Sequence, residues 1–162
     1  MKELKKGLAI ALEGPEAESH LEAFRKQMTA WGLAPPPSDP MIWDFGLGNY
    51  METGLIESWI ANEPEAGYCG KLLFVFDGQT CPMHGHKEKH ETFYILKGQV
   101  SMTCAGKTQE MSEGDVLAVT PGEKHSFTGI GPALLLELSM PCVIEDNYFE
   151  NPQIPIGGNH EA

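Results

Sequence analysis

The sequence predicts a mainly β protein with one domain, in which N-terminal helices precede a small barrel or sandwich. Glycine (18 residues) and proline (12 residues) are frequent, which favours many turns and short strands. After residue 40, short runs rich in β-branched and aromatic residues alternate with Gly or Pro breaks. No long helical pattern separates these runs, so a parallel α/β sheet is not expected. A chain of 162 residues suits a single core.

The N-terminal part has the pattern of helices. We expect a helix over residues 15–31, because Pro15 suits a first helical position and Gly32 suits the residue that follows the last. Its apolar side chains recur at helical spacing and are expected to pack on the rest of the fold: Leu21, Phe24, Met28 and Trp31. A weaker helix is expected over residues 2–12.

A proline-rich run over residues 35–40 blocks helical structure and predicts a stiff linker. We therefore divide the chain into a helical segment with its linker, residues 1–40, and a β-barrel, residues 41–162, within one structural domain. The barrel strands are expected over residues 54–60, 68–76, 82–86, 91–97, 99–104, 108–111, 115–120, 125–128 and 133–140.

Charge and cysteine usage exclude several classes of protein. Acidic residues outnumber basic residues by 23 to 11, so the net charge of −12 disfavours binding to nucleic acid. The four cysteines form no CxxC pair, which argues against a zinc finger and indicates reduced thiols. No apolar run approaches the length of a membrane-spanning helix, and we expect a cytoplasmic protein without a membrane partner.

Four residues form the pattern of a metal site. His84 and His86 are two residues apart, so on a strand both imidazoles point to the same face. Glu91 opens the next apolar run, and His125 begins a later one. Three neutral nitrogens and one carboxylate suit a divalent transition metal and leave coordination positions open for substrate.

The order and spacing of these residues resemble the two-part signature of the cupin superfamily. The first part is Gly78-x5-His84-x-His86-x4-Glu91-x6-Gly98, and the second contains Gly114-x7-Gly122-x2-His125. The second part departs from the usual pattern at Thr120 and Gly129, but it keeps the histidine. The resemblance implies a double-stranded β-helix barrel in which the three histidines and Glu91 bind one metal.

The other three histidines are not expected to bind the metal. His90 is next to Glu91, so strand alternation turns it to the opposite face. His20 lies on the predicted helix and His160 in the tail, where both are expected to be solvated.

Glu137 is a candidate general base. It stands in the apolar run from Leu134 to Leu138, and a carboxylate there is costly unless a cation lies nearby. The metal inside a barrel would supply that cation. The alternative is a carboxylate that faces solvent on the barrel exterior. Lys89 shares the alternation of Glu91 and is a second candidate, its alternative being a solvated loop lysine.

Several stretches also resemble bacterial D-lyxose isomerases of the cupin type. They include Asp44-Phe-Gly-Leu-Gly48, Lys89-His-Glu-Thr-Phe93 and Pro121-Gly-Glu-Lys-His-Ser-Phe127. The resemblance implies an aldose–ketose isomerase that interconverts D-lyxose and D-xylulose, with D-mannose and D-fructose as further substrates. It also implies catalytic roles for Lys89 and Glu137, and manganese as the metal, with zinc, iron, cobalt or nickel as substitutes.

The short loop between His86 and Lys89 departs from that family, so the preferred sugar is left open. Asp44 and Asp146 either bind sugar hydroxyls or cap turns. Three alternative functions use the same ligands: an iron dioxygenase, a non-catalytic sugar sensor, and a phosphosugar isomerase. The last would need a basic cluster near the pocket, where only four lysines are expected: Lys71, Lys87, Lys89 and Lys124. We also expect a homodimer formed through edge strands or residues 1–31, because an open barrel has exposed edges.

Overall fold

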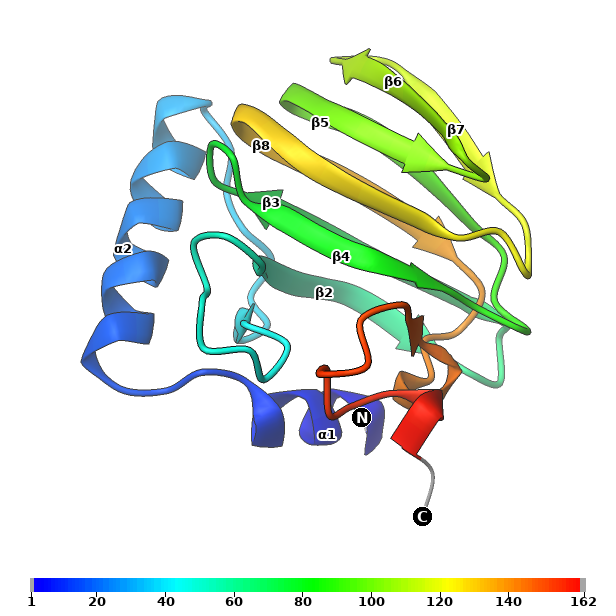
Figure 1. Cartoon of the computed structure of the whole chain (residues 1–162). Coiled ribbons are helices and arrows are strands. Elements are labelled where there is room, and N and C mark those ends of the chain that lie inside the picture. The colour runs from blue at the N-terminus through cyan, green and yellow to red at the C-terminus, as the bar shows by residue number, and fades with distance from the viewer. Residues whose placement is uncertain (1, 161–162) are drawn as a thin grey trace.

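Two α-helices precede one strongly curved antiparallel sheet in the computed structural model, which describes residues 2–160 (Figure 1). The helices are α1 (Lys2–Ile10) and α2 (Pro15–Ala30). The strands are β1 (Met41–Trp43), β2 (Leu55–Glu63), β3 (Tyr68–Val75), β4 (Thr80–Gly85), β5 (Glu91–Cys104), β6 (Lys107–Ser112), β7 (Val116–Val119), β8 (His125–Ser139) and β9 (Tyr148–Phe149). Two 3₁₀ helices, η1 (Ile144–Asp146) and η2 (Gly158–His160), flank β9.

Strand β8 connects the two halves of the sheet. Its first half pairs with β4 and its second half pairs with β3, while β5 pairs along most of its length on the other side. Beyond β3 the order continues to β2 and β1, and β5 also carries β6 and β7. The sheet therefore curls around an interior onto which alternate residues of β2, β3, β4, β5 and β8 point.

Both predicted helices are present. Pro15 occupies the first turn of α2, and Gly32, with a φ of 70°, follows its last turn. The absence of a Cβ makes this backbone conformation accessible, so the helix ends where expected. Phe24 and Met28 are fully buried against the outer surface of the sheet, as their helical spacing predicts.

Two predicted strand breaks are wrong. Residues 91–97 and 99–104 form the single strand β5, and residues 125–128 and 133–139 lie in the single strand β8, which ends one residue before the predicted end at 140. The register shifts on both sides of Lys97, and Gly98 has a φ of 74°. Gly98 therefore belongs to a β-bulge that keeps the strand continuous while it bends. The short strands β1 and β9 were not predicted.

Two apolar clusters lie on opposite faces of the sheet. The larger one fills the barrel and includes Phe93, Ile95 and Phe127. The smaller one lies between α2 and the outer face, and it includes Phe74 and Leu134. His20 belongs to this second interface: its ring lies 4.4 Å from that of Tyr50, and its side chain is 17% exposed. The prediction that His20 is solvated is therefore wrong, because α2 turns this residue toward the sheet.

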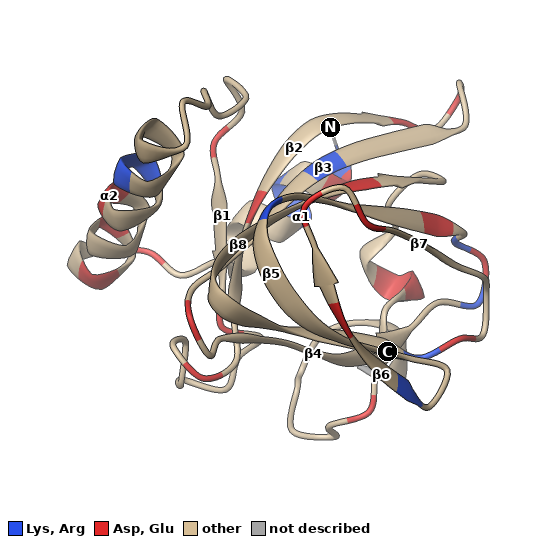
Figure 2. Cartoon of the chain, turned by 90° about the horizontal axis from the view of Figure 1, so that it is seen from above, with Lys and Arg blue, Asp and Glu red and all other residues tan. Residues whose placement is uncertain are grey.

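Acidic residues are spread over α2 and the ends of the strands (Figure 2). Within residues 2–160, no helix has the length and apolar character needed to cross a membrane. The side chain of His160 lies outside the described residues, so its predicted solvation is not assessed.

Candidate metal centre

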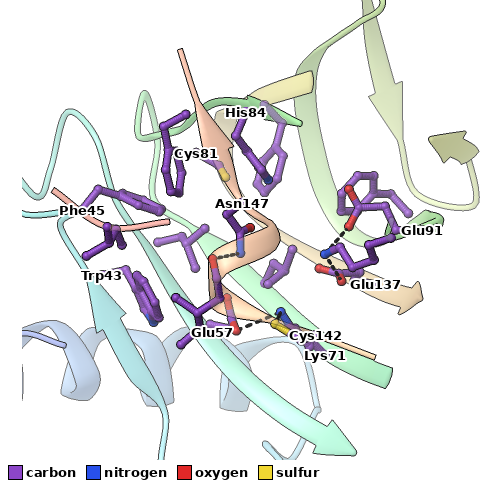
Figure 3. Close-up of a pocket in the computed structure, with 18 of the residues that line it drawn as sticks. Trp43, Phe45, Glu57, Lys71, Cys81, His84, Glu91, Glu137, Cys142 and Asn147 are labelled. Atoms are coloured by element: carbon purple, nitrogen blue, oxygen red, sulfur yellow. Dashed lines mark hydrogen bonds and ion pairs between the residues drawn. The ribbon is translucent and has the colours of Figure 1, made fainter. Parts of the chain in front are cut away.

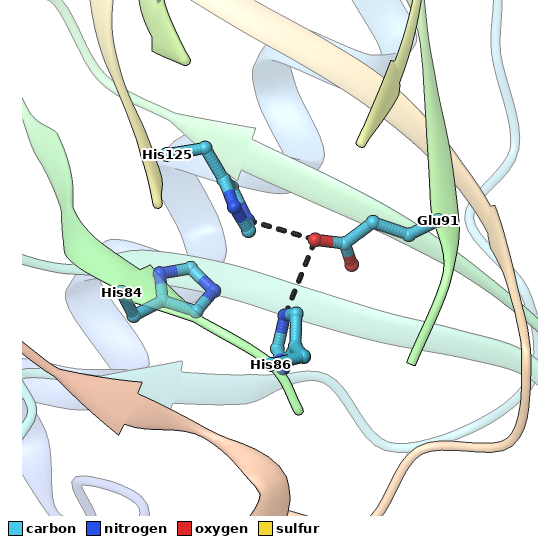
Figure 4. Close-up of side chains that lie close together, drawn as sticks. All are labelled: His84, His86, Glu91 and His125. Atoms are coloured by element: carbon cyan, nitrogen blue, oxygen red, sulfur yellow. Dashed lines mark ion pairs between the residues drawn. The ribbon is translucent and has the colours of Figure 1, made fainter. Parts of the chain in front are cut away.

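Four buried side chains converge inside the barrel (Figure 4). His84 lies near the end of β4 and His86 directly follows that strand, while Glu91 begins β5 and His125 begins β8. Their candidate ligand atoms all lie within 4.8 Å of one another. His84 and His125 are also direct partners in the β4–β8 register. The curvature of the sheet thus brings together residues that are 41 positions apart (84 to 125) in the chain.

Backbone carbonyl groups orient the three imidazole rings. Nδ1 of His84 lies 2.8 Å from the carbonyl oxygen of Pro82, and Nδ1 of His86 lies 2.9 Å from that of Asp146. Nδ1 of His125 makes a longer contact of 3.5 Å with the carbonyl of Glu123. A carbonyl oxygen only accepts hydrogen bonds, so each Nδ1 carries the proton. The Nε2 lone pairs are therefore free to bind a metal, as in metal sites with ordered outer partners.

The inward-facing atoms fit a cation. Oε1 of Glu91 lies 2.8 Å from Nε2 of His125 and 3.2 Å from Nε2 of His86. These three atoms are buried and have no hydrogen-bond partner within the described residues. Lone pairs this close repel one another unless a positive charge lies between them. The donor set of three imidazole nitrogens and one carboxylate oxygen is one that binds divalent transition metals.

The protonation states agree with this reading. Burial, followed by the neighbouring imidazoles of His125 and His86, lowers the pKa of His84 well below its ordinary value. His84 is therefore neutral and able to act as a ligand. Burial raises the pKa of Glu91, but the adjacent Lys89 ammonium together with the neighbouring His125 and His86 side chains outweighs that effect and lowers the pKa below its ordinary range. Glu91 is thus a carboxylate.

Lys89 and Glu137 both face the barrel interior beside this cluster. Nζ of Lys89 lies 2.7 Å from Oε2 of Glu91 and 3.0 Å from Oε1 of Glu137. Both residues are buried, so the solvent-exposed alternatives are excluded. Figure 3 shows Glu91 and Glu137 on the same side of the pocket, joined through a shared amino group. The alternation predicted for β8 is observed, because Leu138 is exposed on the outer face.

The charges of this pair support one another. Burial lowers the pKa of Lys89, but the carboxylates of Glu137 and Glu91 reverse that effect and raise it above the ordinary value. Burial raises the pKa of Glu137, but the Lys71 and Lys89 ammonium groups outweigh this effect, and the pKa lies below its ordinary value. Glu137 is therefore ionised and able to accept a proton.

Asp44 and Asp146 cap turns. The carboxylate of Asp44 accepts hydrogen bonds from the backbone N–H groups of Gly46 and Gly48. Asp146 accepts hydrogen bonds from the N–H groups of the loop that follows His86, at residues 87–89. Asp146 thus holds the short loop that precedes Glu91, and its carbonyl group orients His86. Of the two roles that the sequence allows for these aspartates, the structure shows the capping of turns.

His90 is exposed and takes no part in the cluster, which confirms that alternation places Glu91 rather than His90 inside. A pocket opens beside the cluster, and its walls carry aromatic side chains such as Trp43, Phe45 and Phe149. Two further charged residues, Glu57 and Lys71, also line this pocket. Glu57 was not predicted, although a charge within the apolar run 55–60 is the same signal that identified Glu137.

Comparison with known proteins agrees with this site. Residues 73–139 match the family described as Cupin domain, and this range contains all four cluster residues and Glu137. The D-lyxose/D-mannose isomerase of Thermosediminibacter oceani is 31% identical over 166 aligned positions, which cover 85% of this chain and 90% of that protein. The chain belongs to the cupin-type D-lyxose isomerase family.

Two further proteins support the family assignment and the fold. The D-lyxose ketol-isomerase of Cohnella laeviribosi is 30% identical over 82% of this chain and 87% of its own length. The crystal structure of Cellulomonas parahominis L-ribose isomerase with L-ribose superposes with a TM-score of 0.72, at 17% identity, over 90% of this chain and 95% of that one. The second comparison shows that the cupin fold extends over most of the chain, as the sequence pattern predicted.

Proposed function

We propose that this protein is a metal-dependent aldose–ketose isomerase that interconverts D-lyxose and D-xylulose, with D-mannose and D-fructose as a second pair. The observation that carries the proposal is the position of Glu137. Its ionised carboxylate lies in the pocket wall, and the amino group of Lys89 bridges it to Glu91 of the four-residue cluster. The names of the curated relatives specify this reaction class.

Glu137 is proposed to move the proton between the two reacting carbons. In the aldose it removes the proton from C2, and the electron pair of that C–H bond forms the C1–C2 double bond of an enediolate. The protonated Glu137 then returns the proton to C1, while the O2 hydroxyl gives up its proton and O1 holds the one it has gained, which gives the ketose. Glu137 is suited to this role because its carboxylate is ionised and lines the pocket beside the cluster.

Lys89 is proposed to stabilise the oxygen on which negative charge develops. Its amino group is a cation that already contacts both Glu91 and Glu137. A protonated amine in this position donates a hydrogen bond to O1 and passes a proton to it when the enediolate forms. The amine recovers a proton from the O2 hydroxyl when the ketose forms. The capped loop of residues 87–89 holds the backbone of this lysine in place before substrate binds.

The metal is proposed to be manganese, held by His84, His86, Glu91 and His125. When bound, a divalent ion of this kind polarises carbonyl and hydroxyl oxygens as a Lewis acid. The one-carboxylate, three-imidazole set suits several divalent transition metals. Metal analysis of protein purified without added metal, followed by reconstitution with each ion in turn, tests the assignment to manganese.

The proposed reaction is tested by incubating the metal-loaded protein anaerobically with D-lyxose, D-xylulose, D-mannose and D-fructose. We expect NMR to show interconversion within each aldose–ketose pair without oxygen consumption. In D₂O, proton transfer through a carboxylic acid is expected to place deuterium on the reacting carbon. The proposal would be refuted if none of the four sugars were converted, and a requirement for oxygen would indicate a dioxygenase.

We further propose a cytoplasmic homodimer. Apolar side chains of neighbouring strands are exposed on the outer face of the sheet, among them Tyr94, Val116 and Leu138. The helix α2 turns Phe24 and Met28 toward its own sheet, so the outer strands are the better-supported contact surface. Light scattering of the purified protein tests this, because a monomer would contradict the proposal.

A further inference from the structure

A second charged group lies in the pocket, away from the metal cluster. Nζ of Lys71 lies 3.1 Å from Oε1 of Glu57, and the two side chains are 5% and 13% exposed. Figure 3 shows this pair on a different side of the pocket from Glu91 and Glu137. Lys71 and Lys89 are the buried lysines of the described chain, and both line this pocket. Neither Glu57 nor Lys71 gives or takes a proton in the transfer described above, although the Lys71 ammonium lowers the pKa of Glu137.

The strand register places the pair at a defined separation from the proposed base. Lys71 on β3 is the direct partner of Glu137 on β8, and Glu57 lies on β2, the next strand beyond β3. Adjacent strands are about 4.8 Å apart, so β2 and β8 are separated by about 10 Å along the sheet. A short sugar whose C1 and C2 lie beside Glu137 is therefore long enough to reach Lys71 and Glu57 with its other end.

The pair retains unused hydrogen-bonding capacity. Nε1 of Trp59 and Nζ of Lys71 both contact Oε1 of Glu57, which leaves Oε2 without a donor within the described residues. The other polar contact of the Lys71 amino group is Sγ of Cys142, at 3.2 Å, and sulfur is a weak acceptor. The ammonium also lies 5.0 Å from the centre of the Trp59 ring. A hydroxyl group, which both donates and accepts, complements a free carboxylate oxygen and an ammonium.

Stability alone does not account for this arrangement. A buried ion pair is often no more stable than apolar side chains of similar size, because both charges lose their water. Most of the neighbouring pocket wall is in fact apolar, for example Leu55, Leu73 and Trp43. A charged pair within such a wall is consistent with recognition of a polar ligand.

We infer that Glu57 and Lys71 bind the hydroxyl groups at the end of the sugar remote from C1 and C2, and so determine which sugars are accepted. This inference rests on the proposed isomerase function. A carboxylate beside the ammonium makes this end unsuited to a phosphate group, because Glu57 would repel the anion. The residues are therefore assigned to specificity for a neutral polyol chain, and they are not assigned to the chemical step.

The test compares D-lyxose with analogues that lack the C4 or the C5 hydroxyl. In the wild-type protein, a hydrogen bond between a hydroxyl and a charged group is worth roughly 10- to 100-fold in kcat/KM, and we expect a loss of this size for at least one analogue. In the Glu57→Leu/Lys71→Met variant the same deletion is expected to cost less than about 3-fold, because the partners of the hydroxyl are gone.

The matched control removes an exposed ion pair of the same length, Lys124 and Glu150, whose atoms also lie 3.1 Å apart. The Lys124→Met/Glu150→Leu variant is expected to keep the wild-type ratio between D-lyxose and its analogues. If the pocket variant fails to fold, Glu57→Gln serves instead, because it retains the size and hydrogen-bonding ability of the side chain. In that variant the ratio of kcat/KM for D-lyxose to kcat/KM for the deoxy analogue is expected to fall several-fold, because the charge of Glu57 is lost.

Two results would overturn the inference while the isomerase function stands. One is a wild-type protein that converts the deoxy analogues as well as D-lyxose. The other is a pocket variant that retains the full wild-type ratio, which would make Glu57 and Lys71 a purely structural pair. A wild-type protein that converts none of the sugars would instead refute the proposed function itself, and this inference with it.

Discussion

Substitution of Glu137 by glutamine separates catalysis from metal binding. The amide has nearly the size of the carboxylate but cannot accept a proton from carbon. General base catalysis typically contributes about 10²- to 10⁴-fold, so we expect kcat to fall at least about 10³-fold for a base with no close substitute. Glu137 is not among the four cluster residues, and Lys89 keeps its 2.7 Å contact with Glu91. The metal content is therefore expected to be unchanged.

Steady-state kinetics on D-lyxose, metal analysis and thermal unfolding of the same preparation measure these effects. Ser139→Ala is the control, since the Ser139 hydroxyl donates a hydrogen bond to Oε1 of Glu137 at 2.9 Å without being able to replace it as a base. We expect a decrease of only a few-fold for this variant, in keeping with one lost hydrogen bond of about 1 kcal/mol. A Glu137→Gln protein that keeps its metal and turns over within tenfold of the wild type would refute the mechanism.

Three further predictions concern stability. Gly98→Ala is expected to lower the free energy of unfolding by about 2–4 kcal/mol in urea titration, because φ is 74° and a Cβ would meet the Pro132 carbonyl; an unchanged stability would contradict the bulge. Removal of metal with a chelator is expected to lower Tm, because an ion present at 100 times its Kd stabilises the folded state by about 2.7 kcal/mol, and added Mn²⁺ should restore the Tm. Burial raises the pKa of Cys69 from 9.0 to about 11, so the folded state retains this proton longer than the unfolded state, and stability should fall as pH rises from about 9 toward 11. Urea denaturation at several pH values in that range measures how the free energy of unfolding changes with pH, with Cys69→Ala as the control. If stability falls as steeply with pH in Cys69→Ala as in the wild type, other groups are responsible.

Much of the candidate metal centre could be predicted from the sequence because it depends on local alternation. His84 and His86 point to one face wherever residues 84–86 are extended, and Glu91 and His90 point to opposite faces for the same reason. Glu137 followed the same logic, since a charge in an apolar strand must face either solvent or a charged partner. The family resemblance then placed His125 with the others, which spacing alone could not do.

The partners across the barrel depended on the tertiary structure. Lys71 and Glu137 are 66 positions apart (71 to 137), and only the β3–β8 register makes them neighbours. Asp146 reaches the N–H groups of residues 87–89 because η1 packs against the loop before β5. His20 was misjudged because the pattern of α2 does not specify how far its buried face extends around the helix.

The sequence by itself therefore determined the mainly β fold, the two helices, the four inward-facing candidate ligands and the candidate base, because each follows from a residue and its near neighbours along the chain. Only the tertiary structure decided that residues 91–104 form one bulged strand, that Lys89 lies between two carboxylates, and that Glu57 and Lys71 share the same pocket. The physical reason is that these features arise from strand register and sheet curvature. Both are set by packing between segments distant in the chain.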